Sequence, residues 1–82
     1  MSTFTRYFFN VITASGADND VEGAEFASLE EARAEAVLDA RELMSTAILD
    51  GRDVSGRSIE ICNEAGETLL VLPFREAIST TE

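Results

Sequence analysis

The sequence predicts an α+β domain in which two pairs of strands flank one long helix, in the order ββαββ. Three observations predict this order. Aromatic and β-branched residues dominate positions 5–14, a capped run of helix formers follows Ser28, and a Gly-containing connection at 63–66 separates two short apolar runs. The simplest arrangement is an antiparallel sheet of about four strands with the helix packed on one face.

The first strand, at residues 5–14, carries large apolar side chains on both faces: Tyr7, Phe9 and Val11 on one, Phe8 and Ile12 on the other. A strand with one face in solvent alternates apolar and polar side chains, so both faces are expected to be covered. Two interpretations are open for the face of Phe8 and Ile12. Either residues 74–78 cover it, or it forms an interface between two copies of the chain.

The helix is expected at residues 29–50. Ser28 is a suitable N-cap, and Glu31 lies at the position that completes a capping box. Gly51 suits the left-handed residue that ends many helices. At 100° per residue one broad stripe is apolar and faces the core: Leu29, Ala32, Ala36, Val37, Ala40, Leu43, Met44, Ala47 and Ile48.

The remaining elements are short: strands within residues 17–26, at 57–63 and at 68–72, one helical turn at 74–78, and a frayed end at 79–82. Gly66 is placed for a left-handed residue in the last hairpin. Pro73 ends the last strand, because proline has no N–H for the ladder. The 82 residues predict a single domain, 1–82, with an ordered core of about 5–78.

The net charge of the chain limits the kinds of partner that it is expected to bind. The chain has 16 acidic residues against six arginines, a formal net charge of −10. This charge repels phosphate backbones and anionic membranes, so neither nucleic acid nor a membrane surface is expected as a partner. No apolar run approaches the ~20 residues that cross a bilayer, and residues 1–10 do not resemble a secretory signal. A cytoplasmic protein with a basic or mainly apolar protein partner is expected.

Catalytic groups are scarce. The sequence has no histidine and no lysine, so the commonest general base and the amine nucleophile are missing. Cys62 is the one cysteine, and the negative charges of Glu60 and Glu64 beside it disfavour a nucleophilic thiolate. We expect a protein that is not an enzyme and has no cofactor.

Two segments are candidates for binding a small ligand or a metal ion. Residues 18–23 imitate the opening of a calcium loop, with Asp18, Asp20 and Glu22 followed by glycine. Leu29 stands where that loop needs a bidentate glutamate, so these three acids are weak metal candidates beside the interpretation of a solvated turn. The second segment, residues 51–56, is expected to be structural, with ligand binding as the alternative.

The outer face of the helix carries an acidic stripe: Glu31, Glu35, Asp39 and Glu42. Neighbours in this stripe are three or four residues apart, so their like charges repel. The stripe is either a solvated face that favours solubility or a docking surface for a basic protein. With the doubly apolar first strand, it favours a non-enzymatic interaction or regulatory module, and Phe8 with Ile12 favours a homodimer.

The chain also resembles a family of short proteins from soil and plant-associated bacteria that is known only as a domain of unknown function. The resemblance rests on an opening Arg-Tyr-Phe-Phe strand, on the loop at 51–56 and on scattered positions between residues 6 and 78: Asp20, Glu22, Gly23, Leu29, Ala32, Arg33, Ala34, Glu35, Ala36, Gly66, Pro73 and Phe74. Family members often have Asp-Gly after the first strand, where this chain has Thr13 and Ala14. The resemblance implies one compact domain and no activity.

Overall fold

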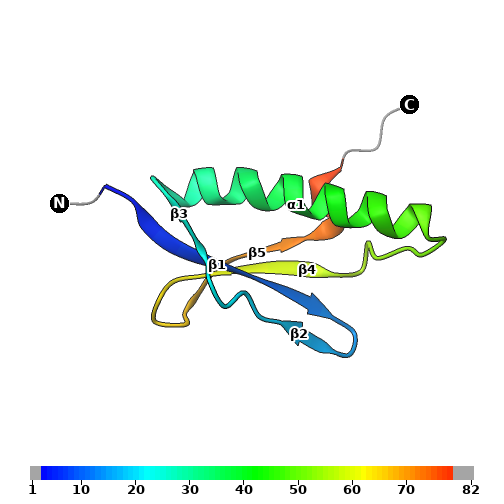
Figure 1. The fold of residues 1–82 in the computed structure, drawn as a ribbon, viewed down its shortest axis with the longest axis horizontal. Helices are drawn as coiled ribbons and strands as arrows, with labels where there is room; N and C mark the ends of the chain where they lie inside the picture. Colours follow the sequence, from blue (N-terminus) through cyan, green and yellow to red (C-terminus); the bar gives the residue numbers. More distant parts are fainter. Residues whose placement is uncertain (1–2, 79–82) are drawn as a thin grey trace.

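The computed structural model describes residues 3–78, and the frayed end expected at residues 79–82 lies outside this range. One helix packs against one face of an open antiparallel sheet, so the predicted α+β class is confirmed (Figure 1). The elements in chain order are β1 (Thr5–Thr13), β2 (Gly16–Asp18), β3 (Ala24–Phe26), α1 (Leu29–Leu49), β4 (Ser58–Cys62), β5 (Thr68–Pro73) and the 3₁₀ turn η1 (Phe74–Ala77).

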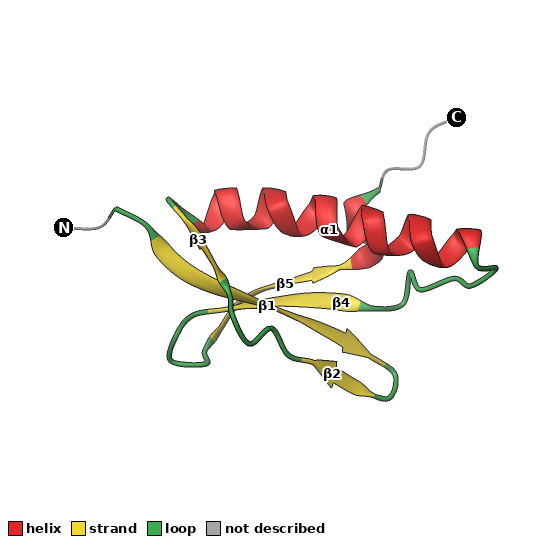
Figure 2. Ribbon diagram, viewed as in Figure 1, coloured by secondary structure: helices red, strands yellow, loops and turns green. Residues whose placement is uncertain are grey.

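The sheet has the strand order β2-β1-β4-β5, and β1 pairs with both β2 and β3 (Figure 2). The second strand expected within residues 17–26 is therefore two short strands. β2 pairs with the end of β1 through Val11, Ile12 and Thr13, and β3 pairs with its beginning. Residues 19–23 leave the ladder between them.

Asp20 fills the gap that this departure leaves beside β1. Its carboxylate accepts one hydrogen bond from the backbone N–H of Phe9, at 3.1 Å, and another from that of Gly23, at 3.0 Å. The backbone N–H of Asp20 donates to Oδ1 of Asn10 at 2.9 Å. Without β2 or β3 opposite it, the N–H of Phe9 would need another partner, and Asp20 supplies it.

Gly23 lets the chain return to β1 at close range. Its φ is 68°, in the left-handed region that favours glycine. A Cβ atom here would also lie 2.8 Å from the carbonyl oxygen of Tyr7 and 2.9 Å from Cε1 of Phe8. Both the backbone conformation and the space therefore require glycine.

Both ends of α1 follow the sequence pattern. Oγ of Ser28 accepts from the N–H of Glu31 at 3.2 Å, while the Glu31 carboxylate accepts from the N–H of Ala27 rather than from that of Ser28. At the other end Gly51 has a φ of 79°. The N–H of Arg52 donates to the carbonyl of Ala47 at 2.7 Å, and that of Gly51 to Ile48 at 2.9 Å, which forms a Schellman motif.

The core lies between α1 and the sheet and is built around small helix residues. Four alanines and one methionine form the buried side of α1: Ala32, Ala36, Ala40, Met44 and Ala47. They pack against Ile59 and Ile61 of β4 and Leu72 of β5. Leu43 and Ile48 were expected in this stripe, but they are 40% and 63% exposed, because they lie at its margins.

The turn η1 lies on the helix side of the sheet. Phe74 is fully buried in the core cluster with the helix alanines, and Nε of Arg41 donates to the carbonyl of Ala77 at 2.6 Å. The interpretation that residues 74–78 cover the face of Phe8 and Ile12 is therefore wrong. Pro73 ends β5 and directs the chain toward α1, where the Phe74 ring fills space that the alanines leave.

The opposite side of the sheet, here called the open face, is therefore covered by neither α1 nor η1. Phe8, Asn10 and Ile12 of β1 lie on it, opposite Cys62, Glu60 and Ser58 of β4. Strand alternation places Val71 there too, since Leu70 and Leu72 pack toward the helix. A register shift beside Cys62 makes β5 irregular at Leu69.

Candidate functional site

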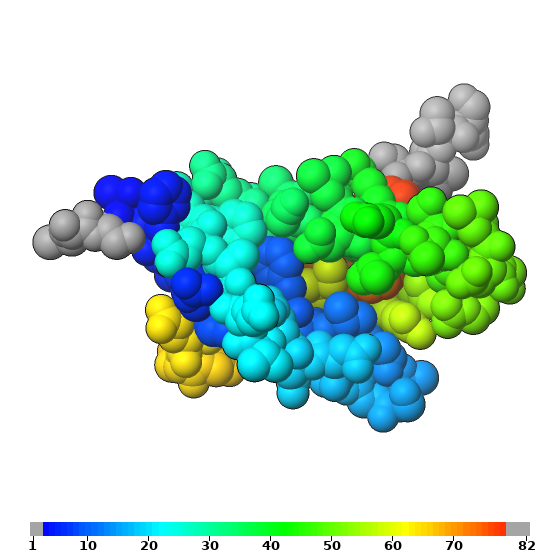
Figure 3. All heavy atoms as spheres, viewed as in Figure 1, coloured from blue at the N-terminus to red at the C-terminus, as the bar shows by residue number. Residues whose placement is uncertain are grey.

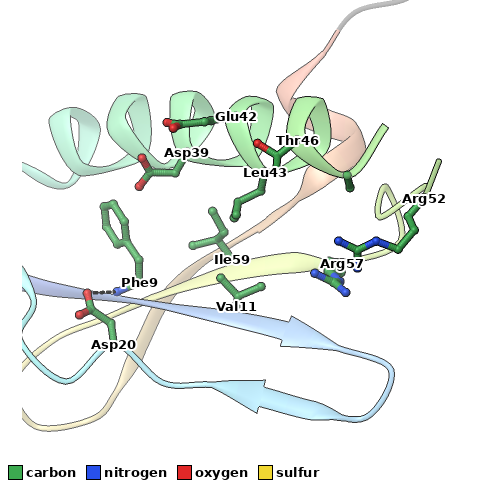
Figure 4. Close-up of a pocket in the computed structure, with 11 residues that line it drawn as sticks. Phe9, Val11, Asp20, Asp39, Glu42, Leu43, Thr46, Arg52, Arg57 and Ile59 are labelled. Atoms are coloured by element: carbon green, nitrogen blue, oxygen red, sulfur yellow. Dashed lines mark hydrogen bonds between the residues drawn. The ribbon is translucent and has the colours of Figure 1, made fainter. Parts of the chain in front are cut away.

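A groove of about 490 Å³ lies between α1 and the β1–β2 side of the sheet. The molecular surface is hollowed between the helix, in green, and the strands in blue and cyan (Figure 3). Phe9 and Val11 of β1 and Ile59 of β4 form its floor, and Leu43 with Thr46 of α1 forms one wall (Figure 4). This volume falls within the range of roughly 300–1,000 Å³ that is usual for small-molecule sites.

Three carboxylates make up the acidic end of the groove: Asp20, Asp39 and Glu42. Asp39 and Glu42 project from α1 above Phe9, and Asp20 approaches from beside β1 (Figure 4). Partial burial raises the pKa of Asp39 above its ordinary value, and the neighbouring charges of Glu35, Glu42 and Asp20 raise it further. A cation placed here would relieve this repulsion.

Arg52 and Arg57 make up the basic end, on the other side of Val11 and Ile59 (Figure 4). The Schellman motif after α1 fixes the backbone of Arg52. The backbone of Arg57 is held twice, because its N–H donates to Val54 at 3.0 Å and its carbonyl accepts from Phe74 at 2.9 Å. Two anchored positions thus present guanidinium groups to one end of the groove.

Two residues of the acidic stripe lie in the groove, and the other two lie outside it. Asp39 and Glu42 line the groove, whereas Glu31 takes part in the N-terminal cap of α1. Glu35 is half-buried beside Asp39 and raises its pKa. Binding of a basic protein along the whole stripe stays a prediction.

The calcium-like segment has a different structure from a metal loop. Both carboxylate oxygens of Asp20 accept backbone hydrogen bonds, Asp18 is exposed on β2, and the carbonyl of Glu22 accepts from Arg6 at 2.8 Å. Among residues 3–78, no three or more His, Cys, Asp or Glu side chains gather in a way that could hold a metal ion.

The loop at residues 51–56 contains the turn that the sequence indicates. Oδ1 of Asp53 accepts from the N–H of Ser55 at 2.9 Å. This backbone bond, the Ser55 hydroxyl and the more distant Arg75 hold the pKa of Asp53 below its ordinary value. Asp53 is thus a turn residue, and it is Arg52 of this loop that reaches the groove.

The structure brings together residues that the sequence separates. Asp20 belongs to one predicted ligand segment and Arg52 to the other, and they lie at opposite ends of the same groove. Sequence reasoning missed Arg57, Leu43 and Thr46 as lining residues. No local signal marks them, because the groove exists only where α1 crosses above β1.

The open face is the second candidate surface. Phe8 and Ile12 lie on it, as strand alternation predicts, and both are half-buried. Leu69 and Val71 of β5 add apolar surface with exposed fractions of 43% and 51%. The period of two within residues 68–72 could have predicted them. Cys62 is also on this side, where its Sγ lies 3.5 Å from Nδ2 of Asn10 and 3.7 Å from Oγ1 of Thr68.

A family model described as a domain of unknown function, DUF6894, matches residues 6–75 of the chain. The protein is a member of the DUF6894 family. The DUF6894 match spans every strand and the helix described above, from the start of β1 into η1. It also contains both ends of the groove and all four apolar residues of the open face. No match to this DUF6894 chain was found among curated proteins or solved structures.

No helix within residues 3–78 is both long enough and apolar enough to cross a lipid bilayer.

Proposed function

We propose that this protein is a non-enzymatic interaction module of the cytoplasm, and that its open face pairs with the open face of a second copy. The observation that carries the proposal is the apolar surface formed there by Phe8, Ile12, Leu69 and Val71. Both α1 and η1 lie on the other side of the sheet, so neither of them covers these side chains. Phe8 and Ile12 stay half-buried, and Leu69 and Val71 are exposed.

The distribution of charge supports a second copy as the occupant. Two chains with a net charge of −10 repel each other, so they can approach closely only through a weakly charged surface. Along β1, β4 and β5 the open face carries a single carboxylate, Glu60, while the acidic stripe belongs to the helix layer. Face-to-face pairing would place the two stripes on the outer sides of the dimer, where salt screens them over about 8–10 Å.

Apolar burial supplies the driving force for such pairing. A fully buried valine or leucine side chain contributes about 1.5–3 kcal/mol relative to an exposed one. Leu69 and Val71 are about half exposed, so each copy would gain part of this value at two positions. The small, alanine-rich core leaves a chain of this size with a thin margin of stability, which a dimer would increase.

Size-exclusion chromatography with light scattering tests the proposal. We expect a mass near twice that of the 8.9 kDa chain at high concentration, with dissociation on dilution. Leu69→Gln combined with Val71→Gln should shift the equilibrium strongly toward the monomer while leaving helix content unchanged.

The matched control combines Leu38→Gln with Leu49→Gln. It removes two large apolar side chains that are 56% and 85% exposed on α1, which lies on the other side of the sheet. This control should dimerise like the natural chain. A monomer at every concentration, or equal dissociation of both double variants, would contradict the proposal.

A further inference from the structure

The groove between α1 and β1 has charges of opposite sign at its two ends and an apolar floor between them. Asp20, Asp39 and Glu42 form the acidic end, and Arg52 and Arg57 form the basic end. Val11, Leu43 and Ile59 separate the two ends (Figure 4). Ligand sites commonly combine an apolar lining with a few placed polar groups that fix orientation, and this groove has that composition.

Most of these charges have no partner within the described residues. No hydrogen bond or ion pair among residues 3–78 engages the side chains of Asp39, Glu42 or Arg57. Arg52 lies 3.6 Å from Asp50, but both side chains are about 60% exposed, so this contact holds the guanidinium weakly. The two ends do not neutralise each other, because the apolar floor lies between them.

The apolar floor of the groove is accessible in part, at Phe9 and Val11. The alanines of α1 allow a close approach to β4 and β5, while Phe9 and Val11 of β1 are only partly buried. Leu43, a large apolar side chain that α1 contributes to the groove lining, is itself 40% exposed, whereas Ile59 is only 1% exposed. An apolar ligand body could therefore cover Val11 and Leu43 and remove further apolar surface from water.

We propose that the groove binds a small zwitterion, with its ammonium group at the acidic end, its carboxylate at the basic end and an apolar body between them. Guanidinium groups suit a carboxylate, since their paired N–H donors match its two oxygens. An ammonium group near Asp39 and Glu42 offsets the repulsion among the carboxylates. This site is separate from the open face and does not depend on dimerisation.

A series of ω-amino acids provides the probes. Isotope-labelled full-length protein is titrated with ω-aminohexanoate and ω-aminooctanoate, and amide chemical shifts are followed by NMR. We expect saturable shifts at Val11, Leu43 and Thr46, which line the groove. Hexylamine and hexanoate share the apolar body but carry one charge each, so each should bind about five- to tenfold more weakly than ω-aminohexanoate.

Variants test both ends separately. Asp39→Asn and Arg57→Gln should each weaken ω-aminohexanoate binding by about five- to tenfold. Glu64→Gln and Arg33→Gln make the same charge changes at positions outside the groove and should leave the affinity unchanged. Thermal unfolding of all four variants confirms that each is folded.

Four results would overturn the proposal. They are the absence of saturable shifts with either amino acid, shifts confined to the open face, equal affinity for hexylamine and ω-aminohexanoate, and equal effects of the groove variants and their controls. Loss of dimerisation in the open-face variant leaves the expected zwitterion affinity unchanged, so the two proposals can fail independently.

Discussion

At the scale of single residues, Asp20 explains how β1 tolerates an interrupted neighbour. Two short strands pair with its ends, and one carboxylate satisfies the backbone N–H of Phe9 at the gap between them. The same carboxylate holds Gly23, so the return of the chain to β3 depends on it as well. The sequence places an acid here but gives no sign of this role, because its partners are backbone groups ten or more residues away or in a turn.

Asp20→Ala should lower the free energy of unfolding by about 1–3 kcal/mol, since two partly buried N–H groups lose their acceptor. For a domain of this size that corresponds to a fall in Tm of about 4–8 °C per kcal/mol. Asp18→Ala is the control, because Asp18 is exposed on β2 and surface changes usually stay within about 0.5 kcal/mol. Equal shifts in the two melting curves would contradict the role given to Asp20.

Asp39 should make stability depend on pH. Burial and nearby carboxylates raise its pKa in the folded chain above the ordinary 3.8, so protonation favours folding. Below pH 3.8 the Asp39 carboxyl is mostly protonated in both the folded and the unfolded chain, so its charge does not destabilise the fold. As the pH rises through the higher pKa of the folded state, the carboxyl ionises and the free energy of unfolding falls. Asp39→Asn should raise the Tm at pH 7 and change it little near pH 3, as followed by circular dichroism. A lower Tm for this variant at pH 7 would contradict the expectation.

At the scale of secondary structure, α1 shows what sequence patterns can and cannot predict. Its bounds, the Ser28 cap and Gly51 follow from local chemistry, since the groups involved lie within a few residues. The exposure of Leu43 and Ile48 could not be predicted in this way. It depends on how the helix axis crosses the sheet, which is determined by contacts between distant elements.

Ser28→Ala should destabilise the protein by about 1 kcal/mol, because the N–H of Glu31 loses the acceptor that caps the helix. The loss appears in chemical denaturation as a lower midpoint with an unchanged slope. Ser45→Ala, at an exposed position in the C-terminal part of α1, should be neutral or slightly stabilising, since alanine is the better helix former. A neutral Ser28→Ala would mean that the Glu31 carboxylate alone maintains the cap.

At the scale of the whole molecule, the chain has two layers, and its Cα atoms span 46 × 31 × 17 Å. The sequence predicts this architecture because two hairpins and one helix have one simple way to pack. It also predicts a second apolar face on β1, but not what lies against it. The structure shows that η1 does not lie against this face. Phe74 is buried in the alanine-rich core on the other side of the sheet, so it cannot cover Phe8 and Ile12.

The groove belongs to the same scale. Its residues come from β1, β4, α1 and the segments after β2 and α1, so no window of the sequence contains more than part of it. The sequence indicates Asp20 and Arg52 separately as members of two loops. Their relation across an apolar floor appears only when the sheet order places β4 beside β1.

The position of β5 at the end of the sheet has a consequence for colloidal behaviour. Its outer backbone groups have no strand partner among residues 3–78, and residues 69–72 are Leu-Leu-Val-Leu, with no charge. An uncharged, β-prone edge of this kind is a template for cross-β aggregation. The irregular pairing at Leu69 and the missing N–H of Pro73 shorten the usable edge to a few residues. Conditions that loosen η1 from α1 would free this strand, so aggregation on heating should begin at β5.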